Sequence, residues 1–223
     1  LRDGPPWAGR GAGCDGTGRG AQVHAEAKPG VEVVFGLGGT SLPHDHAEAL
    51  ALAVAVWLPW LEDEPSAGIH PLRTAPTTQG MVLLARRARM TLRVPAHRAA
   101  ASLGLSEKRL EVGEGLAIGG GEVKALVPSP TLYSGRVASM APDDRAFHDE
   151  VARWLDAVGV HGEIISGRPR RFAAGGHEVL AYGLALHGLS PADSVRVQGE
   201  GLGPHRRLGC GIFVPHKAIA VPD

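Results

Sequence analysis

The sequence has no excess of charge of either sign. Its 223 residues include 23 lysines and arginines and 23 aspartates and glutamates, so the formal net charge is zero. No global electrostatic field draws a polyanion to such a chain, and any binding of nucleic acid has to depend on local basic patches. Three such patches are present and consist of arginine: Arg86, Arg87, Arg89 and Arg93; Arg168, Arg170 and Arg171; Arg206 and Arg207.

Cysteine is scarce as well. Cys14 and Cys210 lie far apart, and the chain has no CxxC pair. The sequence therefore supports neither a cysteine-based zinc cluster nor a redox motif. Two cysteines in unlike contexts favour reduced thiols, and we expect a cytoplasmic protein.

Long apolar runs and aromatic side chains are also few. A membrane-spanning helix needs about 18 or more apolar residues, and the best candidate, Ala47–Leu61, is interrupted by Glu48 and Pro59. We therefore expect no membrane partner. Phe, Trp and Tyr make up 4% of the chain, which argues against an open sheet covered with base-stacking rings.

Residues 1–30 differ from the rest of the chain. They are rich in glycine and contain three prolines, without any apolar periodicity. Such a segment cannot bury enough apolar surface to offset the entropy lost on ordering. We expect residues 1–30 to be a disordered or non-native N-terminal extension.

From residue 31 the pattern becomes that of a folded chain. Residues 31–37 are rich in β-branched side chains and predict a strand, and Asp45 is placed to cap a helix over 46–58. Four further elements are expected: strands over 81–85 and 90–95 joined by a tight arginine-containing turn, a short helix over 95–103, and extended structure over 109–127. The order β-α-β-β-α-β is that of the ferredoxin-like fold.

The second half repeats this order. Residues 142–158 place Phe147, Val151 and Leu155 on one stripe, which predicts an amphipathic helix, and Ser190-Pro191 is typical of the start of another helix over 190–198. Four strands are expected around them: 132–139, 160–166, 179–187 and 212–214, the middle two joined by an arginine-rich turn. The sequence therefore predicts an α+β protein of two tandem ferredoxin-like (RRM-like) domains, 31–128 and 129–223.

A glycine-rich loop follows the last predicted helix. The segment GEGLGPHRRLGCGIFVP (199–215) surrounds Arg206 and Arg207 with glycines and ends in a short apolar strand. Glycine lets backbone N–H groups approach a ligand, and the guanidinium fork matches phosphate. The alternative is a glycine-rich hairpin with a solvated arginine tip.

His44-Asp45-His46 is the local motif that most directly suggests a catalytic site. Histidine exchanges protons near neutral pH, which suits RNA cleavage by the ribose 2′-hydroxyl, because that nucleophile is already tethered to the phosphorus it attacks. The same HxH pattern with His70 as a third ligand offers the alternative of a metal site.

Three segments in order carry a resemblance to a known family: VVFGLGGTSLPHDHAEALALAVAVWLPWLE…GIHPLRT (33–74), PSPTLYSGRV (128–137) and GLSPADSVRVQGEGLGPHRRLGCGIFVPHK (188–217). They resemble the CRISPR-associated repeat-RNA-processing endoribonucleases of the RAMP superfamily, and among these the MYXAN subtype. Together they span most of residues 31–217.

The resemblance implies the same tandem fold and a metal-independent endoribonuclease without a cofactor. Such an enzyme cleaves CRISPR repeat RNA to mature crRNA, leaving 2′,3′-cyclic phosphate and 5′-hydroxyl ends. It implies His46 as a catalytic residue, with His44 as its complement. The expected partners are repeat RNA, crRNA and other Cas subunits of a type I interference complex. The residues expected to bind RNA are Gly201, Gly203, His205, Arg206, Arg207, Gly209 and Lys217.

Two alternative functions remain open at this point. One is a non-catalytic RAMP scaffold that binds crRNA within an interference complex. The other is a metal-dependent hydrolase that uses His44, His46 and His70.

Overall fold

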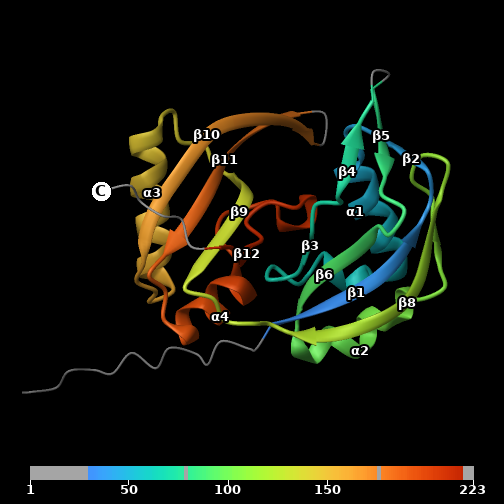
Figure 1. Cartoon of the computed structure of the whole chain (residues 1–223), viewed down its shortest axis with the longest axis horizontal. Helices are drawn as coiled ribbons and strands as arrows, with labels where there is room; N and C mark the ends of the chain where they lie inside the picture. The colour runs from blue at the N-terminus through green and yellow to red at the C-terminus, as the bar shows by residue number, and fades with distance from the viewer. Residues whose placement is uncertain (1–29, 78–79, 175–176, 218–223) are drawn as a thin grey trace, which may run out of the picture.

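The computed structural model describes residues 30–77, 80–174 and 177–217. The expectation for the N-terminal extension therefore lies outside the described residues, except for Gly30, which begins the first strand. Two antiparallel sheets with their helices lie next to each other, and the C-terminal segment runs between them (Figure 1). No helix in the described part of the chain is long and apolar enough to cross a membrane.

The first large sheet is built around β1 (Gly30–Gly38). Strands β6 (Arg89–Pro95) and β8 (Leu116–Ala125) pair with it on either side, both antiparallel. The short strand β3 (Gly68–Ile69) pairs with β6, and the short strand β7 (Arg109–Leu110) pairs with β8. The strand order is therefore β3-β6-β1-β8-β7. Apart from β7, this is the strand order of a ferredoxin-like sheet.

The helical elements of this half have the following bounds: α1 (His46–Trp57), η1 (Pro59–Leu61), η2 (Ala96–Arg98), α2 (Ala99–Ser102) and η3 (Leu103–Leu105). Helix α1 buries Leu50 and Val54 in the core formed with the sheet residues Val33 and Phe35. The prediction of a helix near residue 46 is confirmed. Asp45 occupies its N-cap position, but its side chain makes no capping hydrogen bond.

The predicted pairing of strands 81–85 and 90–95 in one sheet is wrong. Strand β5 (Met81–Leu84) instead pairs with β2 (Ser41–Pro43) and β4 (Thr74–Pro76) in a separate three-stranded sheet. The position beside β6 is taken by β3 (Gly68–Ile69). Two residues are too few to show a strand periodicity, so sequence patterns did not reveal β3.

The second large sheet has the order β10-β11-β9-β12, which is again the ferredoxin-like order. Its elements have the following bounds: β9 (Thr131–Ala138), α3 (Asp144–Ala157), β10 (Glu163–Ala174), β11 (His177–His187), α4 (Pro191–Glu200), η4 (Arg206–Leu208) and β12 (Val214–Pro215). Both helix starts have side-chain caps, since Asp143 accepts a hydrogen bond from the Ala146 amide and Ser190 from the Asp193 amide. The predicted α+β fold is thereby confirmed.

The arginine-rich segment of this half is strand rather than turn. Strand β10 runs through Arg168, Arg170 and Arg171, and its pairing with β11 shifts register between Ser166 and Pro169. A bulge absorbs the extra residue there and allows the strand to continue. Apolar side chains form one core cluster in each half. The boundary at residues 128/129 stays a prediction.

Candidate RNA-cleavage site

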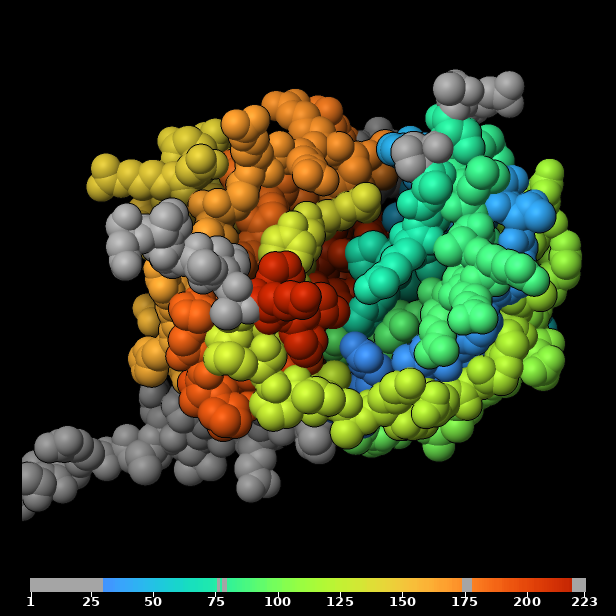
Figure 2. All heavy atoms as spheres, in the orientation of Figure 1, coloured from blue at the N-terminus to red at the C-terminus, as the bar shows by residue number. Residues whose placement is uncertain are grey.

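The glycine-rich segment after α4 lies between the two halves. Its short helix η4 packs against β3 and α1, and the red C-terminal segment fills the space between the halves in Figure 2. Arg206 at the start of η4 is only 6% exposed. The glycine-rich segment therefore has both buried and exposed side chains.

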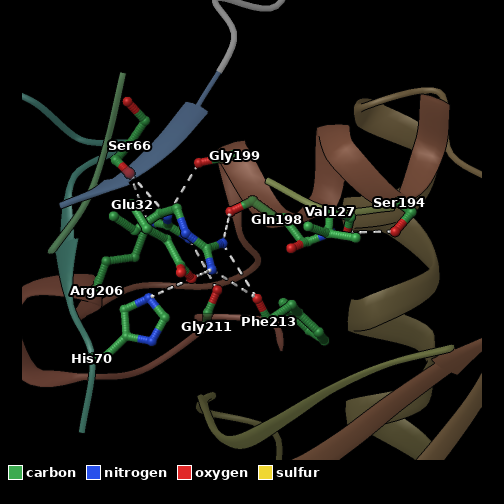
Figure 3. Close-up of polar contacts among 11 residues, drawn as sticks. Glu32, Ser66, His70, Val127, Ser194, Gln198, Gly199, Arg206, Gly211 and Phe213 are labelled. Carbon is green, nitrogen blue, oxygen red and sulfur yellow. Dashed lines mark hydrogen bonds and ion pairs between the residues drawn. The ribbon is translucent and has the colours of Figure 1, made fainter. Parts of the chain in front are cut away.

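The Arg206 guanidinium is held by main-chain oxygens from both halves. Nε and Nη2 donate to the carbonyl of Ser66 at 3.1 and 2.8 Å. Nη1 donates to the Gly211 carbonyl at 2.9 Å, and Nη2 also donates to that of Gly199 at 3.1 Å (Figure 3). Burial lowers the pKa of Arg206, and the nearby charge of Arg93 lowers it further. This guanidinium faces the interior, although Arg206 also lines a cavity of about 620 Å³. Its predicted role in RNA binding stays a prediction.

Two of the loop glycines make room for this arrangement. Gly201 and Gly211 have φ of 68° and 63°, in the region that favours glycine. A Cβ at Gly201 would overlap the guanidinium of Arg206, and one at Gly211 would overlap the carbonyl oxygen of Leu202. Gly209 is buried against Pro71 in the same way. Gly201 thus makes room for the Arg206 side chain, and Gly209 and Gly211 make room for other parts of the chain.

The side chain of the neighbouring Arg207 points toward solvent. Its side chain is 46% exposed, and Nη1 lies 3.8 Å from the carboxylate of Glu62. Together with Gly203 and His205, it lines a cavity of about 620 Å³ between α1 and the loop. His205 is exposed with a left-handed backbone (φ 65°) and forms the N-cap of η4. Lys217 is exposed two residues after β12.

His46 is the first residue of α1. Its Nδ1 lies 2.9 Å from the carbonyl oxygen of Pro43. Because a carbonyl only accepts, Nδ1 carries the proton in this contact, and Nε2 of the neutral ring has the free lone pair. His44 is 70% exposed, and its Nδ1 lies 3.1 Å from the carboxylate of Asp45. The two histidines are therefore in different hydrogen-bonding environments.

A smaller cavity of about 110 Å³ brings several predicted residues together. His44, His46 and Arg207 line it, and so do two residues of the second half that the sequence did not single out, Arg136 and Phe172. His44 and Arg136 also line a neighbouring cavity of about 580 Å³. Arg136 is the one charged residue in strand β9, and a lone charge in an otherwise apolar and small-residue strand is the signal that identifies it.

His70 borders the same small cavity, and 15% of its side chain is exposed. Its pKa is lowered to about 3 by burial and by the charges of Arg93 and Arg206. Nε2 lies 3.5 Å from the Glu32 carboxylate. Among the residues that the structure describes, no three His, Cys, Asp or Glu side chains are grouped so that they would hold a metal ion. The alternative ligand set of His44, His46 and His70 is thus not assembled here.

Comparisons with known proteins agree with the fold and with the sequence resemblance. Among solved structures, one titled CRISPR associated protein Cas6 superimposes with a TM-score of 0.63 at 11% identity, covering 84% of this chain and all of its own. A structure titled as a RAMP protein binding different RNA substrates gives 0.60 at 14% identity, covering 85% of this chain and all of its own. The fold is therefore that of the RAMP proteins.

Sequence similarity identifies the family within the RAMP proteins. The Cas6 family model, described as Cas6 Crispr, matches residues 31–218. The CRISPR-associated endonuclease Cas6 of Myxococcus xanthus (strain DK1622) is 36% identical over 187 residues, covering 83% of this chain and 81% of that protein. The chain belongs to the Cas6 family of crRNA-processing endonucleases.

Proposed function

We propose that the protein cuts CRISPR repeat RNA within each repeat, without a metal ion, to give mature crRNA with 2′,3′-cyclic phosphate and 5′-hydroxyl ends. Membership of the Cas6 family supports the substrate class. The observation that carries the mechanism is the His46 ring, whose Nδ1 donates to Pro43 and whose Nε2 is left as a proton acceptor beside a cavity lined by two arginines.

His46 is the general base in this proposal. Its contact with a main-chain carbonyl fixes the tautomer and the ring orientation, as a base requires. A positioned histidine supplies about 10²–10⁴-fold of rate as an acid or base. Main-chain fixation also means that the base does not depend on another side chain for its orientation.

His44 is the complementary acid. The Asp45 carboxylate lies 3.1 Å from its Nδ1 and accepts a hydrogen bond from Nδ1–H, which orients the ring. The 2′-oxygen loses its proton to His46 and forms a bond to phosphorus. The bond from phosphorus to O5′ breaks, and O5′ receives a proton from His44. The products are the cyclic phosphate and the 5′-hydroxyl.

In this proposal, the exposed residues of the glycine-rich loop bind the RNA. Arg207, His205 and Gly203 line one cavity in common, and Arg207 also borders the cavity of His44 and His46. Phosphate contacts of this kind position the RNA backbone without reading its sequence. Lys217 is exposed and extends the basic surface. Gly201, Gly209 and Arg206 act by holding the loop in shape.

Three measurements on the wild-type protein test the proposal. Repeat RNA is incubated with the protein in excess EDTA, and the product ends are analysed. A second RNA carries a 2′-deoxy nucleotide at the cut site. We expect cleavage in EDTA, cyclic phosphate ends and no cleavage of the deoxy RNA.

The alternatives give different results. Binding without cleavage would indicate a crRNA-binding scaffold, and cleavage that stops with EDTA and resumes with added metal would indicate a metal-dependent hydrolase. Product that stays bound after cleavage would fit transfer of crRNA to other Cas subunits of a type I interference complex, the partners that the family resemblance implies.

A further inference from the structure

The cavity beside His46 contains a positive charge that comes from the other half of the molecule. Arg136 on β9 and Phe172 on β10 line it opposite His44 and His46, which precede or begin α1. The cavity is therefore a composite site, with its proton-transfer groups from the first half and this cation from the second.

Arg136 is held in place at its backbone and at its side chain. Its carbonyl accepts hydrogen bonds from the Gly211 amide at 2.7 Å and from the Ser134 hydroxyl at 3.0 Å. Its guanidinium carbon lies 5.2 Å from the centre of the Phe172 ring, over the ring face. An arginine stacked on an aromatic ring keeps its N–H groups free at the edges of the guanidinium plane.

Two other arginines near the cavity lie close to a carboxylate. Arg207 lies 3.8 Å from the Glu62 carboxylate, and Arg171 lies 2.7 Å from that of Glu178. Within the described ranges, no carboxylate lies within ion-pairing distance of Arg136. The acidic residue that shares the cavity, Asp45, is paired with His44. Arg136 is thus a half-buried cation with N–H groups left for a substrate anion.

The cleavage reaction needs such a group. When the 2′-oxygen attacks, the two non-bridging oxygens of the phosphate carry more negative charge in the transition state than in the starting RNA. The histidines move protons but do not neutralise these oxygens. A planar guanidinium donates two parallel hydrogen bonds to them, and a donor held in position costs no reorganisation when the charge develops.

We propose that Arg136 is a catalytic residue that binds the non-bridging oxygens of the scissile phosphate, and that Phe172 is a positioning residue that holds the Arg136 guanidinium. The inference rests on the cleavage reaction proposed above. It also explains why the site uses both halves: the proton-transfer groups lie at the start of α1, and the phosphate-binding cation lies on β9.

The test compares Arg136→Ala with the wild type in single-turnover cleavage at saturating protein. We expect the rate constant to fall about 10²–10³-fold, the usual loss for one transition-state donor. Affinity for uncleavable 2′-deoxy repeat RNA should stay within about 3-fold, since most backbone contacts remain. Arg145→Ala, at an exposed position on α3, is the matched control and should cleave as the wild type does.

A sulfur substitution distinguishes a catalytic from a structural role. Replacing either non-bridging oxygen of the scissile phosphate with sulfur should slow the wild type, because the guanidinium donates to both oxygens. Arg136→Ala should lose most of this slowing. Arg136→Lys keeps the charge but not the planar fork, and it should recover about a tenth of the wild-type rate. If Arg136→Ala does not fold, Arg136→Lys with the two thio-substituted RNAs gives the same test.

Phe172 is tested through its coupling to Arg136. Phe172→Leu should slow cleavage several-fold in the wild-type background and have no further effect in Arg136→Ala, because both changes then act through one group. Arg136→Ala that cleaves within about 3-fold of the wild type, or that sulfur slows as much as it slows the wild type, would overturn the proposal. The wild-type product ends and the 2′-deoxy control test the cleavage reaction separately, so failure of one is distinguishable from failure of the other.

Discussion

Arg93 of the first half binds the main-chain carbonyl of Phe213 in the second half. Its Nη1 and Nη2 atoms both lie 3.2 Å from that oxygen, and Nη1 also lies 2.5 Å from the Gln198 carbonyl. The side chain is fully buried, and its charge is paired with Glu32 at 2.6 Å. Arg93 and Arg206 together join the two halves through main-chain oxygens, and Figure 3 shows the contacts of Arg206.

Replacing Arg93 with Met should destabilise the protein strongly. The substitution leaves the Glu32 carboxylate without its partner and two buried carbonyls without donors. Breaking a buried ion pair in this way costs about 3–5 kcal/mol. Urea unfolding at pH 7 measures the loss, with Arg153→Met on the exposed face of α3 as the control, expected within about 0.5 kcal/mol of wild type. An unchanged urea midpoint for Arg93→Met would contradict the role assigned to the network.

His70 predicts a pH dependence of stability. In the folded protein its pKa is lowered to about 3, first by burial and then by Arg93 and Arg206, whereas an unfolded histidine titrates at its ordinary value. Between these two pKa values the unfolded chain binds the extra proton, so stability rises with pH across this window and falls as pH is lowered.

A His70→Gln variant isolates this effect. Lowering the pH from 7 to 5 should reduce the free energy of unfolding of the wild type by about 2 kcal/mol more than that of the variant. Thermal or urea unfolding at both pH values measures the difference. Equal pH dependence of the two proteins would show that His70 is not held neutral by its surroundings.

The Gly201→Ala substitution should damage the loop. The positive φ disfavours alanine, and the new methyl group would overlap the Arg206 guanidinium, so we expect a loss of well over 1 kcal/mol in stability. Weaker RNA binding should accompany it because η4 positions Arg207. Gly104→Ala, where a Cβ meets nothing within 4 Å, is the control and should melt at or slightly above the wild-type temperature.

The His46→Ala substitution should abolish cleavage and preserve binding. Removal of the proposed base should slow cleavage by about 10²–10⁴-fold, while filter binding of 2′-deoxy repeat RNA stays near the wild-type value. His148→Ala, exposed on α3, serves as the control. Wild-type cleavage by His46→Ala would remove His46 from the mechanism and leave His44 as the candidate base.

Local sequence patterns were sufficient to predict helices α3 and α4. The apolar stripe of Phe147, Val151 and Leu155 predicted α3, and Ser190-Pro191 predicted the start of α4, because caps and helix periodicity depend on residues within a few positions. Family resemblance then supplied the tandem fold, which the structure shares with solved RAMP proteins.

Tertiary structure decided which side chains face inward. Arg206 and Arg207 are equivalent in the sequence, yet one is bound by Ser66, Gly199 and Gly211 while the other is exposed. Likewise, Gly68–Ile69 pairs with β6 in the place that the sequence predicted for Met81–Leu84, which pairs with β4 instead. Strand partners and buried contacts join residues far apart in the chain, and a single sequence has no local pattern that encodes their pairing.

The sequence by itself thus determined the order of the main helices and of most long strands, and the acid–base chemistry available in His44 and His46. Only the tertiary structure decided that Arg136 lies in the cavity with His46 and that main-chain oxygens bind the Arg206 guanidinium. The physical reason is that side-chain direction follows from strand register and packing between the two halves, which are set by long-range contacts.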